Sequence, residues 1–417
     1  MKYYSLNNPS LKATFKEAVI AGIAPDKGLY FPEVIRPLAP SFWEKIETYS
    51  THEIAFQALQ PFVEGDISET TLKQILAKTL DFEFPLVALE PNVAVLELFH
   101  GPTMAFKDVG ARFMAHSLGQ FSNHQEEVTV LVATSGDTGG AVANGFLGVE
   151  GVHVVILYPS RKVSEIQEKQ LTTLGQNITA LEVEGTFDDC QRMVKRAFLD
   201  DEITGKRKLT SANSINVARW LPQLIYYLLA YQQAKKLNKT PVFSVPSGNF
   251  GNICAGIVAQ KLGMPVKHFV ASTNSNDVVP SFMNTGNYEP KPSVATISNA
   301  MDVGDPSNFI RIQKLYDQDF KKLVSSFSSH SFDDTATKDT MKMVYEKSGY
   351  VLDPHGAVGY LGLKKYQETN KDDWGIVLET AHPIKFLPVV KETLGSFSTI
   401  PNCCALLKGV LLQKGGF

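Results

Sequence analysis

The chain has 417 residues, 44% of them hydrophobic and 10% aromatic, which is enough apolar material for a large core in two or three domains. Lys and Arg number 40 and Asp and Glu number 43, and this near-neutral balance excludes nucleic acid or an anionic membrane as the expected main partner. No apolar stretch has the length of a membrane helix, and the first residues contain no apolar signal core. With only four cysteines, we expect a soluble, cytoplasmic, multidomain protein.

The first 92 residues predict a mainly helical N-terminal subdomain. Segments 15–24, 51–59 and 70–80 have helical patterns, the last with apolar residues every three or four positions. His52 and Glu53 resemble the start of a zinc-protease helix, but no second histidine follows at the required spacing. We therefore expect no metal site there.

From residue 93 onward, strands, polar loops and helices alternate. Five short runs, rich in apolar and β-branched residues, have the length of strands: residues 128–133, 152–157, 178–183, 241–245 and 375–378. Helical patterns at 187–198 and 221–236 lie between them. Buried strands that alternate with helices indicate parallel sheets covered on both faces. We predict an α/β fold with two open, mainly parallel sheets flanked by helices, one in residues 93–212 and one in residues 213–417.

A single lysine, Lys107, lies among the apolar residues Met104, Ala105 and Phe106, directly before a predicted helix. Partial desolvation and a helix N-terminus both disfavour the charged form of an amine. A neutral amine is a nucleophile that can form a Schiff base with an aldehyde. The alternative is that Lys107 is a surface residue that caps a turn.

Two loops between a strand and a helix are suited to anions. In residues 248–252 (GNFGN), glycines allow close approach and the helix start supplies amide donors, so phosphate is the natural ligand. In residues 134–140 (TSGDTGG), hydroxyls and amides suit a carboxylate or a phosphate, or only cap a helix. Neither nucleotide-binding glycine fingerprint is present. Together with Lys107, the loops describe a site for an aldehyde cofactor with a phosphate and an anionic substrate.

Five motifs, in order along the chain, resemble those of the threonine synthase family, pyridoxal-phosphate enzymes with the tryptophan synthase β-like fold (fold type II). The motifs are FHGPTMAFKD (99–108), SGDTG (135–139), PSGNFGN (246–252), SNAMDVG (298–304) and TAHP (380–383). The resemblance spans nearly the whole chain. It implies pyridoxal 5'-phosphate as cofactor and the family's fold.

The resemblance also implies roles for individual residues. Lys107 would be the catalytic lysine that forms the Schiff base, and Thr380 would contact the pyridine nitrogen. The cradle for the cofactor phosphate would consist of Gly248, Asn249, Phe250, Gly251 and Asn252. Substrate contacts would come from Ser135, Asp137, Thr138, Ser214, Asn216 and Arg219. An arginine fork suits a phosphate monoester better than a lysine does.

The activity implied by the resemblance is conversion of O-phospho-L-homoserine and water to L-threonine and phosphate, the last step of threonine biosynthesis. This is a carbon–oxygen lyase reaction, in which γ-elimination is followed by addition of water at Cβ. The implied assembly is a monomer or a homodimer.

Two alternatives to this activity stay open at the level of sequence. One is another lyase of the same fold, such as a serine/threonine dehydratase or a cystathionine or cysteine synthase. The other is a catalytically silent relative that binds pyridoxal phosphate or a phosphoamino acid. His100 and His382 adjoin the key loops and either fix turns, which we favour, or donate in the site. Asn299 and Asp302 receive no individual role.

Overall fold

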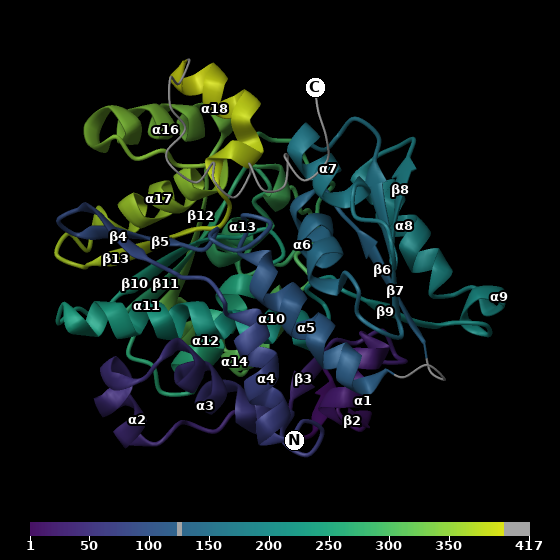
Figure 1. The fold of residues 1–417 in the computed structure, drawn as a ribbon. Helices are drawn as coiled ribbons and strands as arrows, with labels where there is room; N and C mark the ends of the chain where they lie inside the picture. Colours follow the sequence, from purple (N-terminus) through teal and green to yellow (C-terminus); the bar gives the residue numbers. More distant parts are fainter. Residues whose placement is uncertain (123–126, 396–417) are drawn as a thin grey trace.

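Two sheets carry the fold of the computed structural model, which describes residues 1–122 and 127–395 (Figure 1). The larger sheet has the order β12-β11-β10-β13-β5-β4 and consists of β4 (Leu86–Glu90), β5 (Val93–Glu97), β10 (Val242–Pro246), β11 (His268–Thr273), β12 (Phe327–Ser331) and β13 (Gly375–Glu379). The smaller has the order β8-β7-β6-β9 and consists of β6 (Val128–Ala133), β7 (Val152–Pro159), β8 (Ile178–Val183) and β9 (Lys208–Ser211). All neighbouring strands are parallel except β4 and β5.

Helices cover both faces of each sheet. In the larger sheet, α17 (Pro354–Gln367) packs on one face and α12 (Gly251–Lys261) on the other, and in the smaller sheet α6 (Asp137–Phe146) and α8 (Phe187–Ala197) do the same (Figure 1). The remaining helices after residue 93 are α5 (Lys107–Phe121), α7 (Glu165–Thr172), α9 (Asp201–Thr204), α10 (Val217–Trp220), α11 (Leu224–Lys236), α13 (Val278–Thr285), α14 (Phe309–Leu315), α15 (Phe320–Ser326), α16 (Asp334–Ser348) and α18 (Leu387–Leu394). Short 3-10 turns are η2 (Leu221–Gln223), η3 (Asn299–Met301) and η4 (Pro383–Phe386). The predicted α/β fold with two mainly parallel sheets is confirmed.

One strand lies in a different sheet from the one predicted. β5 pairs with β13, with Val95 opposite Val377, and therefore belongs to the six-stranded sheet. The predicted domain of residues 93–212 would group β5 with the smaller sheet, so the boundary at residue 93 does not separate the two sheets. An apolar run reports that a strand is buried, but it carries no information about its partner strand.

The N-terminal region is mainly helical, as predicted, with α1 (Phe15–Ala21), α2 (Pro40–Lys45), η1 (Ile46–Thr48), α3 (Thr51–Val63) and α4 (Glu69–Thr79). A small antiparallel sheet of β1 (Tyr3–Ser5), β2 (Lys12–Ala13) and β3 (Tyr30–Pro32) was not predicted, because strands of two or three residues are too short to show alternation. Glu53 closes the capping box of α3 with Ser50. Glu53 therefore has a structural role at the start of α3, which explains a glutamate next to His52 without a metal site.

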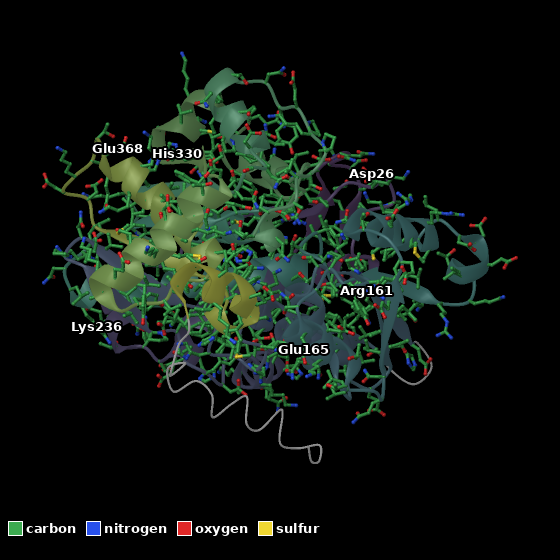
Figure 2. The ribbon with its side chains drawn as sticks, turned by 90° about the horizontal axis from the view of Figure 1, so that it is seen from above. Asp26, Arg161, Glu165, Lys236, His330 and Glu368 are labelled. Carbon is green, nitrogen blue, oxygen red and sulfur yellow. The ribbon has the colours of Figure 1, made fainter. Side chains whose placement is uncertain are left out.

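The charged residues Lys236 and Glu368 are exposed at the periphery when the molecule is seen from above, and Arg161 is exposed as well (Figure 2). Among the described residues, no helix is both long and apolar enough to cross a membrane, and no group of His, Cys, Asp and Glu is arranged to hold a metal ion. The neighbouring cysteines Cys403 and Cys404 lie outside the described residues.

Candidate active site

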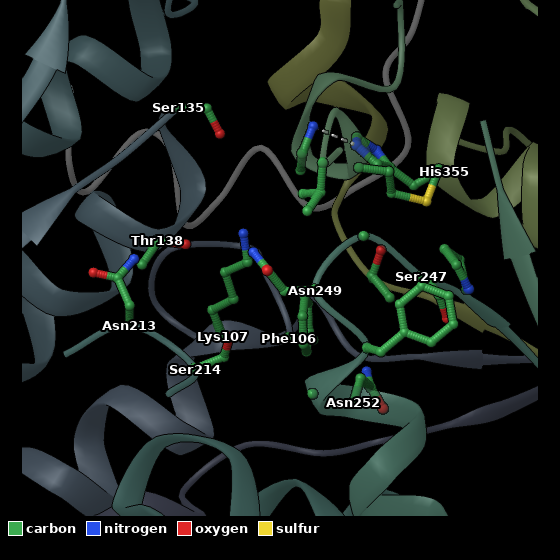
Figure 3. Close-up of a pocket in the computed structure, with 18 of the residues that line it drawn as sticks. Phe106, Lys107, Ser135, Thr138, Asn213, Ser214, Ser247, Asn249, Asn252 and His355 are labelled. Carbon is green, nitrogen blue, oxygen red and sulfur yellow. Dashed lines mark hydrogen bonds between the residues drawn. The ribbon is translucent and has the colours of Figure 1, made fainter. Parts of the chain in front are cut away.

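A pocket lies where α5, α6 and α12 begin, between the carboxyl ends of strands from both sheets (Figure 3). This is the expected place for a ligand in open parallel sheets. The pocket brings together most of the residues that the sequence singled out: Lys107, Ser135, Thr138, Ser214, Arg219, Gly248, Asn249, Phe250, Gly251, Asn252, Asn299, Asp302 and Thr380. Of the proposed site residues, Asp137 and Asn216 do not line it.

Lys107 is the first residue of α5, and its side chain points into the pocket (Figure 3). The backbone amide of Phe106 donates to the carbonyl of Thr380 at 2.8 Å, which holds the lysine beside the end of β13. Burial lowers the pKa of the Lys107 amine to about 8, Asp137 opposes this shift, and Lys385 and Arg219 add to it. The desolvated lysine predicted at a helix start is confirmed.

The loop of residues 248–252 leads from β10 into the N-terminus of α12 and lines the pocket. Phe250 adopts the left-handed conformation (φ 60°), which turns the chain into the N-terminus of α12 at Gly251. The backbone amides of residues 248–253 donate to no backbone acceptor among the described residues. The side-chain oxygen of Asn252 accepts from the Tyr227 hydroxyl at 2.6 Å, while its buried Nδ2 has no protein partner among the described residues.

The glycine at position 248 is required by its surroundings. A Cβ built on Gly248 would lie 2.8 Å from Cα of Met301 and 2.9 Å from the carbonyl oxygen of Ala300. Both are backbone atoms of the turn that covers the loop, so neither can rotate out of the way. The turn therefore packs directly on the loop at Gly248, and both segments line the pocket.

The second loop also offers amide donors. Thr134 Oγ1 accepts from the amides of Gly136 (2.9 Å) and Gly139 (2.8 Å), which shapes the loop. Ser135 and Thr138 both line the pocket, and their backbone amides donate to no backbone acceptor among the described residues. These donors are suited to a carboxylate.

Asp137, which the sequence placed with the substrate contacts, turns away from the pocket. It is buried, and its Oδ1 accepts from Gln167 Nε2 at 2.9 Å and lies 2.8 Å from Lys385 Nζ. Lys385 was not singled out in the sequence, although its apolar neighbours Ile384 and Phe386 are the same local signal that marks Lys107.

Residues 213–219 contribute both pocket and framework. Ser214 lines the pocket. Arg219 also lines it, but its Nε donates to the carbonyl of Ala212 at 2.6 Å and its Nη1 to the carbonyl of Lys107 at 3.2 Å. Burial lowers the pKa of Arg219 to about 10. The guanidinium therefore already supports the backbone of the lysine beside it.

Asn216 has a structural position rather than a place in the pocket. It is fully buried, its Oδ1 caps α10 by accepting from the Ala218 amide at 3.0 Å, and its Nδ2 donates to the carbonyl of Val19 at 2.9 Å. It joins the helix to the N-terminal region, so both ends of its side chain are engaged away from a substrate.

The turn of residues 299–302 is held by a histidine that sequence reasoning missed. His355 lines the pocket, its Nδ1 lies 2.5 Å from Asp353 Oδ2, and its Nε2 accepts from the Ala300 amide at 3.3 Å (Figure 3). An imidazole that accepts at Nε2 is neutral and carries its proton on Nδ1. Burial raises the pKa of the nearby Asp302 carboxyl to about 6, although the hydrogen bonds that it accepts from Thr296 lower this pKa.

His100 and His382 both lie outside the pocket lining. His100 Nε2 lies 2.7 Å from Glu97 Oε2, and His382 Nδ1 accepts from the Ile384 amide at 3.1 Å to cap η4. The favoured reading, in which these histidines fix turns, is confirmed for His382. The hydroxyl of Thr380 faces no hydrogen-bond partner among the described residues, which leaves it available to a ligand.

The comparisons with known proteins agree with this geometry. The family described as "Pyridoxal-phosphate dependent enzyme" matches residues 85–379, and the family "Threonine synthase N terminus" matches residues 2–80. Threonine synthase of Haemophilus influenzae is 44% identical over 96% of this chain and 93% of its own length.

Solved structures give the same result. The crystal structure of threonine synthase from Escherichia coli aligns with a TM-score of 0.90 at 41% identity and covers 96% of this chain and 93% of that chain. The structure of PLP-bound threonine synthase from Brucella melitensis aligns with a TM-score of 0.91 at 34% identity and covers 98% of this chain and 94% of that chain. The chain belongs to the threonine synthase family, among the pyridoxal-phosphate-dependent enzymes.

Proposed function

We propose that this protein converts O-phospho-L-homoserine and water to L-threonine and phosphate, as a pyridoxal-phosphate-dependent carbon–oxygen lyase. The observation that carries the proposal is that the desolvated amine of Lys107 shares one pocket with the amide-lined loop of residues 248–252 and with Ser135 and Thr138 of the second loop.

The pocket fits the cofactor. The amides of residues 248–253 and the unpartnered Nδ2 of Asn252 are donors that a phosphate would satisfy. Only glycine fits at position 248, because a Cβ there would collide with the backbone of Met301 and Ala300. Lys107 and Thr380 lie in the same pocket, where they would hold the aldehyde carbon and the ring nitrogen. Bound pyridoxal phosphate supplies an aldehyde that bonds to amines and a ring that withdraws electrons from the substrate's Cα.

Lys107 is the base that we assign to the reaction. With a pKa of about 8, its nitrogen can take a proton from a substrate carbon and return it near neutral pH. Thr380 offers a hydroxyl and not a carboxylate, so it would not keep a pyridine nitrogen protonated. Carbanion character would then spread less into the ring, which favours elimination and replacement over transamination.

Two groups of residues would bind the substrate. The amides of Ser135 and Thr138 would bind its carboxylate, and the hydroxyl of Thr138 lies at the same wall of the pocket. Ser214 and Arg219 are our candidates for its phosphate, with the guanidinium N–H groups that do not already donate to the backbone.

A product assay tests the activity. Purified holoenzyme is incubated with O-phospho-L-homoserine, and phosphate and threonine are measured together. Equimolar release of both supports the proposal. Ketoacid formation from threonine without phosphate release from phosphohomoserine would instead show a dehydratase of the same fold, and cofactor binding without turnover would show a silent relative.

The oligomeric state and the cellular compartment stay predictions. We expect a monomer or a homodimer, which light scattering of the purified protein measures directly. We expect a cytoplasmic location, which fractionation of cells followed by immunodetection measures.

A further inference from the structure

Lys385 is a buried ammonium group in η4, immediately after β13 of the larger sheet. Its side chain has no exposed surface, and its Nζ lies 2.8 Å from Asp137 Oδ1. The same nitrogen donates to the carbonyl of Thr103 at 2.8 Å and to Gln170 Oε1 at 3.2 Å. Because Asp137 begins α6 and Gln170 lies in α7, this one side chain connects the larger sheet to two helices of the smaller sheet.

The partner of Lys385 belongs to the loop that we assign to the substrate carboxylate. Asp137 lies between Ser135 and Thr138 in sequence, and both neighbours line the pocket (Figure 3). Gln167 donates to Asp137 at 2.9 Å and also packs over Gly136, where a Cβ would lie 2.4 Å from its Cδ. The loop is therefore held from behind by Lys385 and Gln167, while its amides face the pocket.

The same ion pair sets the charge around Lys107. Burial alone would raise the pKa of Asp137, but Lys385 and Lys107 together hold it well below its usual range. Asp137 in turn favours the protonated form of Lys107, and Lys385 disfavours it. Without Lys385, a buried carboxylate would have Lys107 as its remaining nearby cation, and the lysine would stay protonated to a higher pH.

We propose that Lys385 is a positioning residue for the reaction: its pairing with Asp137 fixes the 135–138 loop for the substrate's carboxylate and keeps Asp137 from holding Lys107 in its charged form. The inference rests on the function proposed for this pocket. It assigns to Lys385 no contact with substrate or cofactor.

Three variants of the holoenzyme test the pairing: Lys385→Met, Asp137→Asn and the double variant. The readout is the pH midpoint at which the visible absorbance of the bound cofactor changes, which reports protonation at the nitrogen of Lys107. We expect Lys385→Met to raise this midpoint by roughly one pH unit and Asp137→Asn to lower it by a similar amount. The double variant, which removes both charges, should return toward the wild-type midpoint.

Steady-state kinetics test the loop. Lys385→Met should raise the KM for phosphohomoserine by roughly tenfold or more, because the loop loses its support. Lys338→Met is the matched control, since Lys338 pairs at the surface with Glu392 at 2.7 Å, and it should change neither the midpoint nor the KM. If Lys385→Met does not fold, Asp137→Asn still tests the proposal, because an asparagine oxygen continues to accept from Lys385.

The outcomes separate this proposal from the activity. Identical pH midpoints in the wild type, Asp137→Asn and any folded Lys385 variant would overturn it, even if those variants melt at lower temperature. A wild-type enzyme that releases no phosphate from phosphohomoserine would refute the proposed function, while the absorbance midpoints would still decide the role of Lys385.

Discussion

Gly248→Ala tests whether the 248–252 loop is a cofactor cradle closed by the turn above it. Ordinary contacts begin at 3.4 Å, and the added Cβ would lie 2.8 Å from Cα of Met301, so the turn or the loop must move by about 0.6 Å (3.4 − 2.8). The turn is tied to His355 through the amide of Ala300. Overpacking of this kind costs roughly 1–3 kcal/mol.

If the shift falls on the loop amides, the cost appears in cofactor affinity. We expect the Kd for pyridoxal phosphate to rise about 5- to 150-fold, the range that corresponds to roughly 1–3 kcal/mol. The assay is a fluorescence titration of the apoenzyme with pyridoxal phosphate, with the Tm of the apoenzyme measured in parallel.

Gly251→Ala is the matched variant in the same loop. Its added Cβ would lie 3.3 Å from Cβ of Ser214 and 3.4 Å from Nδ2 of Asn308, which are side-chain atoms at nearly ordinary distances. Its Kd should therefore rise less than that of Gly248→Ala. Equal affinities for the wild type and Gly248→Ala, in a folded protein, would refute the reasoning.

Three further substitutions address the lysine and its neighbours. Lys107→Ala should abolish turnover and the visible absorption of bound cofactor, and a variant that stays active and coloured would refute the assignment. In the wild-type apoenzyme, Lys107 should react with an acylating reagent with a midpoint near pH 8, because its neutral fraction grows as the pH rises through its pKa. Arg219→Ala should raise the KM for phosphohomoserine, while cofactor binding should persist; an unchanged kcat/KM would contradict the substrate role. The same variant should lower the Tm, because two backbone carbonyls lose a charged donor at a cost of roughly 1.5–3 kcal/mol each. Asn216→Ala should lower the free energy of unfolding, measured with denaturant, by roughly 1–3 kcal/mol, because it removes a helix cap and a buried hydrogen bond. The folded variant should keep its KM for phosphohomoserine. A selective rise in that KM would show that Asn216 does contact the substrate.

Local patterns of residues were sufficient to predict the α/β architecture and the lysine at the centre of the pocket. The run 128–133 matches β6 residue for residue, because a strand covered on both faces is built almost wholly from apolar residues, and all six of its positions are buried. The predicted strand 178–183 also matches β8, which is an edge strand and is only partly buried. Lys107 and the loop at 248–252 were also identifiable, since an isolated lysine in apolar surroundings and a glycine-rich helix start are local signals. Both signals are carried by residues within a few positions of each other in the chain.

The tertiary structure alone decided which distant groups meet. Asp137 and Asn216 look like substrate ligands in their motifs, but one pairs with Lys385 and the other caps α10 and binds the N-terminal region. His355 likewise enters the site only through its contact with the Ala300 amide. A buried polar group must find a partner wherever folding places one, and that partner is set by how the sheets and helices pack, which no local pattern of residues encodes.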